Sequence, residues 1–296
     1  EKTLPLPRAV SAGGTVRIAF RNEADPNAVV SELWLWESEA QSPPPAGSDA
    51  SKPQPNSSPP MPQVKPSAKA GDAATRILIV TGIDYPGHKW KQTTPVLKEA
   101  IEKDPRLAVD VVEDPNFLAS PRIHDYAAIV HHWMNWKTPA PGPPARENFR
   151  KFVAGGKGLV VVHFGCGAFQ DWPEFATIAG RAWDPKLRGH DPRGPFRVEI
   201  ADTDHPITRG MKPFEIVDEL YTCLAGSTPI DVLATAQSKV DKKVYPMAFV
   251  LTYGKGRVFH SVLGHDVKAF SPPQVGELFR RASAWAAGLA PVAEGG

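Results

Sequence analysis

Two runs of consecutive apolar residues do most to limit the fold. One lies within the segment Arg76-Ile-Leu-Ile-Val-Thr81 and the other within Gly158-Leu-Val-Val-Val-His163. A strand that is apolar at every position is buried on both faces, and such strands are typical of parallel sheets covered by helices. The two runs therefore predict a central sheet with helices on both sides.

Predicted strands and helices alternate along the rest of this region. Thr94 and Pro95 are typical of a helix N-terminus, as an N-cap and a first-turn proline. The alternation predicts a three-layer α/β sandwich with a mainly parallel sheet. Further strands are expected at 109–113, 127–131, 196–200, 247–252 and 257–262, and helices at 94–103, 145–153 and 273–287.

Proline divides the chain into parts. Nine of the 32 prolines fall within residues 41–70, among serine, alanine and glycine, a composition typical of a tether without a packed core. We therefore expect a linker over 41–72 and the α/β domain over 73–291. Residues 1–40 contain two segments that alternate like strands, and they resemble the last strands of a jelly-roll carbohydrate-binding module.

Composition excludes several classes of protein. A net charge of +2 gives no reason to expect a nucleic acid or an anionic membrane as partner. No apolar run approaches the roughly 18 residues of a membrane-spanning helix. Two cysteines cannot build a disulfide framework or a cysteine-rich zinc module.

Histidines follow several of the predicted strands. In an open parallel sheet, ligands bind beyond the carboxyl ends of the strands, which is where His88, His132, His163 and His265 are expected. Converging imidazoles suit a divalent metal ion, and zinc is the ion we expect first. His163 and His265 are the strongest candidates, because each follows an apolar run and has glycine nearby.

Cys166 offers a competing interpretation. A strand followed by Gly165-Cys166-Gly167 resembles a nucleophile elbow, and a nearby histidine could generate the thiolate. The pattern is incomplete, because Phe164 and Ala168 stand where outer glycines are expected. A cysteine-dependent hydrolase therefore stays open as the weaker alternative.

Acidic and aromatic residues complete the candidate site. Asp218 and Glu219 follow an apolar segment, and Asp266 follows His265, so each could act as a general base or a metal ligand. A loop that contains His190 could close over the pocket. Aromatic side chains in a cleft suit the apolar faces of sugar rings, and tryptophans occur near the same loops: Trp90, Trp133, Trp136, Trp172 and Trp183.

These motifs together resemble the ThuA-like (trehalose utilisation) family. The resemblance spans Arg76 to Leu289 and rests on the order and spacing of these segments: Gly87-His88, Gly158-Leu-Val-Val-Val-His163 with Gly167-Ala-Phe169, Asp204-His-Pro-Ile-Thr-Arg-Gly-Met211, Asp218-Glu-Leu-Tyr221, and Tyr253-Gly-Lys-Gly-Arg-Val-Phe259 with Leu263-Gly-His-Asp266. It implies a flavodoxin-like sandwich similar to class I glutamine amidotransferases, and a role in the metabolism of disaccharides oxidised at carbon 3.

The resemblance also implies roles for individual residues. His163, His265 and His88 would hold a divalent metal or contact a carbonyl oxygen. Glu219 or Asp218 would be the base, with Asp266 orienting His265. The side chains expected to bind the carbohydrate are Trp90, His132, Trp133, Phe169, Trp172 and His190.

A sugar-binding module without catalysis is the main alternative to a glycoside-cleaving enzyme. Such a module would bind sugar without a metal and without the base. The proline-rich tether and the carbohydrate-binding resemblance predict an exported bacterial protein, periplasmic or extracellular.

Overall fold

A ten-stranded sheet forms the centre of the fold in the computed structural model, which describes residues 62–69 and 74–292. The strand order is β1-β3-β2-β4-β5-β12-β11-β10-β7-β8. The strands are β1 (Val64–Lys65), β2 (Thr75–Val80), β3 (Leu107–Val112), β4 (Ala128–His131), β5 (Gly158–Val162), β7 (Gly194–Ile200), β8 (Phe214–Asp218), β10 (Asp231–Gln237), β11 (Val244–Tyr253) and β12 (Gly256–Ser261). A separate small sheet pairs β6 (Ala182–Trp183) with β9 (Leu224–Ala225).

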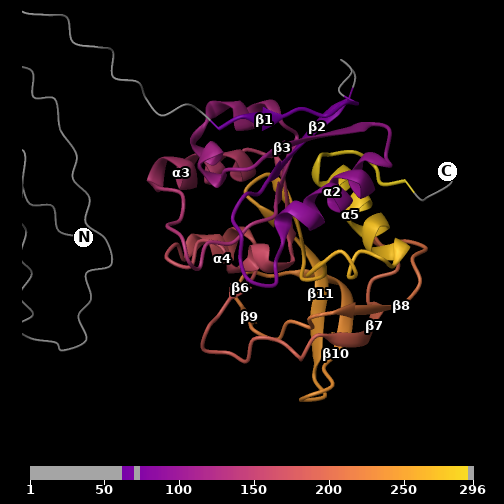
Figure 1. Cartoon of the computed structure of the whole chain (residues 1–296). Coiled ribbons are helices and arrows are strands. Elements are labelled where there is room, and N and C mark those ends of the chain that lie inside the picture. Colours follow the sequence, from indigo (N-terminus) through magenta and orange to yellow (C-terminus); the bar gives the residue numbers. More distant parts are fainter. Residues whose placement is uncertain (1–61, 70–73, 293–296) are drawn as a thin grey trace, which may run out of the picture. The chain divides into compact units, whose positions relative to one another are not determined.

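Helices cover both faces of the sheet (Figure 1). They are α2 (Trp90–Glu102), α3 (Pro143–Ala154), α4 (Glu174–Ile178) and α5 (Pro273–Ala286), with short 3-10 turns η1 (Pro115–Ala119), η2 (Pro121–Asp125) and η3 (His163–Gly167). Successive side chains of a strand point to opposite faces. Accordingly, Ile77 and Ile79 pack with α2 and α5, whereas Leu78 and Val80 pack with α3. This confirms the predicted α/β sandwich.

The parallel part of the sheet is its centre, β3-β2-β4-β5-β12. Beyond β12 the strands β11, β10, β7 and β8 pair antiparallel, and they occupy the orange part of Figure 1. The sequence patterning did not predict β10. Its residues alternate only in part between buried and exposed, so the strand depends on pairing with β11 and β7.

The first long helix begins earlier than predicted. α2 starts at Trp90, and Pro95 lies inside it. Thr94 therefore lies inside the helix and does not cap it, and its hydroxyl lies 3.1 Å from Nδ1 of His132. Packing against the sheet thus overrides the local N-terminal signal of Thr94 and Pro95.

Residues 62–69 fall within the predicted linker but belong to the domain. β1 pairs antiparallel with β3, and the backbone N–H of Ser67 donates to Asp110 at 2.8 Å. These contacts satisfy a buried carboxylate of β3. The predicted strands at 15–20 and 31–36, and most of the predicted linker, lie outside the described residues.

None of the helices in the described part of the chain combines the length and the apolarity that a membrane crossing needs.

Candidate metal centre

Four side chains from distant parts of the sequence converge at one edge of the sheet. His88 lies in the loop after β2, His163 directly follows β5, Glu219 directly follows β8, and His265 lies in the loop after β12. Each residue offers one ligand atom, and the four atoms lie within 4.8 Å of one another. We call these four residues the His/Glu cluster.

The distances within the His/Glu cluster are short. Nε2 of His88 lies 3.2 Å from Nε2 of His163 and 3.3 Å from Nδ1 of His265. Oε2 of Glu219 lies 3.1 Å from Nδ1 of His265, 3.6 Å from Nε2 of His163 and 3.9 Å from Nε2 of His88. All four donor atoms therefore face one common point.

The donor set and its spacing fit a divalent metal ion. In a tetrahedral site with metal–nitrogen bonds of about 2.0–2.1 Å, neighbouring ligand atoms lie about 3.3–3.4 Å apart. The distances between 3.1 and 3.9 Å span this value. Three imidazoles and one carboxylate also match the ligand types of zinc and similar ions. The His/Glu cluster could thus bind a metal ion.

The fold holds His163 in a ligating orientation. Its Nδ1 lies 2.6 Å from the carbonyl oxygen of Val262, so Nδ1 carries the proton and donates it. Nε2 is then left with a lone pair that faces the cluster. The backbone of His163 has a φ of 45°, an unfavourable value for a residue with a side chain. This sharp turn out of β5 aims the imidazole at the other ligands.

Asp218 holds the loop that carries His265. Its side chain is fully buried and accepts the backbone N–H of Gly264 at 2.7 Å and of His265 at 3.2 Å. Burial raises the pKa of the Asp218 carboxyl. The oxygens of Asp218, which the sequence suggested as an alternative base to Glu219, are thus engaged by backbone amides.

Burial and mutual contact set the charges in the cluster. Burial, aided by the neighbouring imidazoles of His163 and His265, lowers the pKa of His88 to about 2. Burial opposes ionisation of Glu219, but the contacts with His163 and His265 outweigh it and hold the pKa of the Glu219 carboxyl below its usual value. The site therefore presents an ionised carboxylate and a neutral His88 imidazole, the forms that bind metals.

Two further polar side chains border the cluster. The hydroxyl of Tyr221 lies 3.0 Å from Nε2 of His163 and 3.5 Å from Nε2 of His88. Nε2 of His190 lies 3.7 Å from Oε1 of Glu219, and its Nδ1 lies 2.8 Å from the carbonyl oxygen of Asp191. Tyr221 is not among the side chains predicted to form the site, although it follows Glu219 by two positions.

A family model described as trehalose utilisation (ThuA) matches residues 76–286, which include all four residues of the His/Glu cluster. The chain belongs to the ThuA family. None of the curated proteins matches this ThuA chain.

Solved structures share the fold of this ThuA chain. A ThuA-like protein from Parabacteroides merdae is 24% identical, with a TM-score of 0.63 over 74% of this chain and 92% of that one. A ThuA-like protein from Bacteroides uniformis is 19% identical, with a TM-score of 0.59 over 73% and 93%. A β-galactosidase from Rahnella sp. R3 is 16% identical, with a TM-score of 0.53 over 75% of this chain but 33% of that one. At these identities the likeness concerns the fold alone.

Most of the aromatic residues expected to bind sugar lie away from the cluster. Trp133 and Phe169 are buried in the core layer with α3, and Trp90 is 6% exposed. His132 is fully buried, and its two ring nitrogens lie next to the hydroxyls of Thr93 and Thr94. Half-buried Trp172 packs on Phe169. These side chains follow the predicted strands, but packing directs them inward.

Asp266 also differs from its expected role. Its Oδ2 lies 2.6 Å from Nη2 of Arg193, and its Oδ1 accepts the backbone N–H of Ala269. No contact between the carboxylate of Asp266 and the ring of His265 is found in the described part of the chain. The backbone contacts of Asp218 hold His265 instead.

Cys166 lacks the properties of a nucleophile. The side chain is fully buried, and burial raises the pKa of its thiol well above the ordinary value. A nucleophilic cysteine needs the opposite shift, toward thiolate. The small residues of η3 instead allow close packing beside the cluster.

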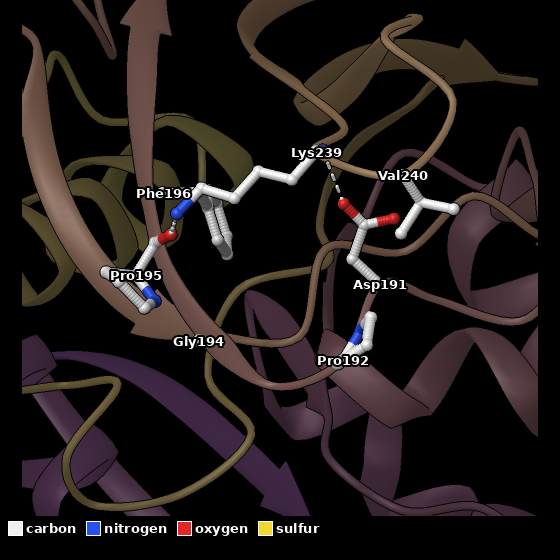
Figure 2. A pocket seen from close by; sticks show the side chains of 7 residues that line it. All are labelled: Asp191, Pro192, Gly194, Pro195, Phe196, Lys239 and Val240. Carbon is white, nitrogen blue, oxygen red and sulfur yellow. Dashed lines mark hydrogen bonds between the residues drawn. The ribbon is translucent and has the colours of Figure 1, made fainter.

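A cavity of about 240 Å³ adjoins the loop that carries His190 (Figure 2). Its lining is largely apolar and includes no residue of the His/Glu cluster. As Figure 2 shows, the Asp191 carboxylate accepts the backbone N–H of Lys239 at 2.8 Å, and it also binds Arg188 and Ser238. Its charge is therefore already neutralised by the protein.

Proposed function

We propose that this protein cleaves glycosides whose sugar ring carries a ketone at carbon 3, with the help of a divalent metal ion. The proposal rests on the His/Glu cluster. Bringing four mostly buried donor atoms to one point costs free energy unless a ligand binds them. Membership of a family described by trehalose utilisation supports a carbohydrate as substrate.

His88, His163, Glu219 and His265 would hold the ion. A divalent ion held there would supply positive charge to stabilise the negative charge that develops on the ketone oxygen as carbon 2 loses its proton. Tyr221 adds a hydroxyl on the same side, within 3.5 Å of two of the imidazoles.

His190 is the side chain best suited to take the proton. Its Nδ1 donates to the Asp191 carbonyl, which leaves Nε2 with a free lone pair, and the imidazole is partly exposed. Glu219, predicted as the base from sequence, would be engaged through Oε2 by the metal. His190 would therefore act where a substrate can reach it, and Oε1 of Glu219, 3.7 Å from its Nε2, would stabilise the imidazolium that forms when the proton is taken.

The proposed reaction proceeds by elimination and then hydration. The base removes the hydrogen of carbon 2 as a proton, a double bond forms between carbons 1 and 2, and the bond from carbon 1 to the glycosidic oxygen breaks. The leaving oxygen keeps the electron pair and gains a proton. Water then adds its hydroxyl to carbon 1 and its hydrogen to carbon 2, so the net change is hydrolysis.

Release of free sugar from a 3-keto-glucoside tests the proposal. Purified protein with bound metal is expected to release the sugar, and a chelator is expected to abolish the release. Glu219→Gln keeps the size of the side chain but weakens metal binding, so metal content and turnover should fall together, by about 100-fold or more, since even partners of ligands cost about 10–100-fold. His124→Ala is the matched control, because His124 contacts Asn148 and lies outside the cluster.

A sugar-binding module without catalysis is the outcome that would contradict the proposal. It would bind the glycoside in the presence of chelator and release no product. Turnover that is unchanged in Glu219→Gln would contradict the role of the cluster.

Export remains a prediction from the sequence, and cell fractionation checks it.

A further inference from the structure

We infer that Trp136 presents an indole platform on which a pyranose ring of the substrate stacks, and that Trp183, whose ring is inclined at 66° to that of Trp136, forms the side of this platform. This inference rests on the proposed function for the nature of the substrate. Of the five tryptophans that the sequence places near these loops, the fold connects these two to the His/Glu cluster through the rings of Tyr221 and Tyr85.

The two indoles belong to a closed circuit of six rings. From the cluster outward, the ring centroids of His163 and Tyr221 lie 4.6 Å apart, and those of Tyr221 and Trp183 lie 5.2 Å apart. The circuit continues with Trp183 to Trp136 at 4.8 Å, Trp136 to Tyr85 at 5.4 Å, Tyr85 to His88 at 5.8 Å and His88 to His163 at 5.1 Å. The metal ligands thus form one arc of the circuit and the large aromatic rings form the other.

Trp136 is held in place although much of it is exposed. Its Nε1–H donates to the carbonyl oxygen of Gly167 at 2.8 Å. A Cβ added to Gly167 would lie 2.9 Å from Nε1 of Trp136, closer than packing allows. Glycine at position 167 therefore makes room for the indole and fixes its edge.

Trp183 is packed in a similar way. A Cβ added to Gly189 would lie 3.1 Å from Cη2 of Trp183. The amide of Gln170 lies 3.3 Å from the carbonyl oxygens of both Gly167 and Trp183, and so ties the two tryptophan segments together. Such preorganised rings lose little conformational entropy when a ligand stacks on them.

Trp136 leaves part of its indole surface available to a ligand. With 38% of its surface accessible, it is the one aromatic residue among the exposed large hydrophobic side chains of the described chain. Rigid aromatic rings beside a polar centre suit a ligand with one apolar face and a polar edge. A pyranose has both, because its C–H bonds can face the indole while its oxygens face the cluster.

Polar side chains around the platform favour a sugar over a purely apolar ligand. The ammonium of Lys137 lies 5.2 Å from the centre of the Tyr85 ring. The ring centroids of His190 and Trp183 lie 6.4 Å apart. Both would offer hydrogen-bonding groups near a ring stacked on Trp136. Lys137 also gives the outer end of the platform a positive charge.

Titration with a sugar that is not turned over tests the platform separately from catalysis. The probe is trehalose, whose binding is followed by calorimetry, together with kcat and KM for 3-keto-trehalose. Trp136→Ala is expected to weaken trehalose binding and raise KM by about tenfold, with kcat within about twofold and metal content unchanged. Trp136→Phe should restore most of the affinity, and Gly167→Ala, which displaces the indole, should reproduce the loss.

Trp285→Ala is the matched control, because this half-buried tryptophan lies on α5 and contacts His205 rather than the circuit. Equal affinity for trehalose in the wild type, Trp136→Ala and Trp183→Ala would overturn the inference, as would a wild-type protein that binds neither sugar. If the wild type binds trehalose through Trp136 but releases no product from the 3-keto sugar, the proposed function fails and the platform stands.

Discussion

Nδ1 of His163 lies 2.6 Å from the carbonyl oxygen of Val262. The two residues directly follow β5 and β12, which are parallel neighbours in the sheet. The sheet therefore sets the separation between an imidazole and the acceptor that orients it. The same strand pairing brings the loop that carries His265 beside His163. One pair of strands therefore positions two of the four residues of the His/Glu cluster.

This contact predicts the tautomer of His163. The proton should reside on Nδ1 in the metal-free protein, because the Val262 carbonyl can only accept. Nitrogen NMR of a histidine-labelled sample checks this, and added Zn²⁺ should shift the Nε2 resonance while Nδ1 stays protonated. A proton on Nε2 in the metal-free state would contradict this orientation of the ligand.

Asp218→Asn is expected to weaken both the fold and the metal site. The asparagine amide has only one acceptor oxygen, whereas the carboxylate accepts the N–H groups of Gly264 and His265 with two. A buried donor therefore loses its partner, which lowers the free energy of unfolding by about 1–3 kcal/mol. Chemical unfolding and metal titration measure the two effects. Asp266→Asn is the control, because the partly exposed ion pair with Arg193 contributes about 0–1 kcal/mol. Equal losses in the two variants would contradict a special role for Asp218.

Gly87→Ala is expected to disturb the metal site through one contact. Gly87 has a φ of +89°, and a Cβ added there would lie 3.3 Å from Cε1 of His265. Gly210→Ala is the matched control, because Gly210 has a φ of +78° and nothing within 4 Å of an added Cβ. Both variants should lose roughly 1–2 kcal/mol of stability from backbone strain, but Gly87→Ala alone should lose metal affinity.

Acid is expected to destabilise the metal-free protein through histidines outside the cluster. Burial lowers the pKa of His131 to about 3 and that of His260 to about 4. The unfolded chain, with histidine pKa values near 6.5, then binds more protons than the folded chain between about pH 6.5 and pH 4. The free energy of unfolding should therefore fall with decreasing pH, by about 1.4 kcal/mol per pH unit for each histidine.

Unfolding by urea at pH 7.5 and pH 5.0 measures this loss. His131→Phe should show a smaller loss than the wild type, because the ring lies among Trp133, Phe149 and Phe175 and phenylalanine cannot be protonated. An identical pH dependence in the variant would show that His131 does not carry the effect.

Much of the fold could be predicted from local patterns. Continuous apolar runs mark β2 and β5, because strands buried on both faces leave no polar positions. Where a segment depends on its neighbours, the patterns fail. β1 lies in a proline-rich stretch and is held by β3. α2 starts before Thr94, whose hydroxyl contacts His132.

The candidate site divides in the same way. Its histidines were found from the sequence, because the carboxyl ends of parallel strands meet at one edge whatever the details of packing. The directions of the side chains could not be predicted from the sequence, because they depend on contacts between residues far apart in the chain. Asp218 turns to the backbone of Gly264 and Glu219 to the imidazoles, although the two acids are adjacent. Trp133 is buried, whereas Trp136 is exposed and packs on Tyr85, which packs on His88 of the cluster. Local chemistry thus determined which residue types reach the edge of the sheet, and long-range packing alone decided which of them face one another.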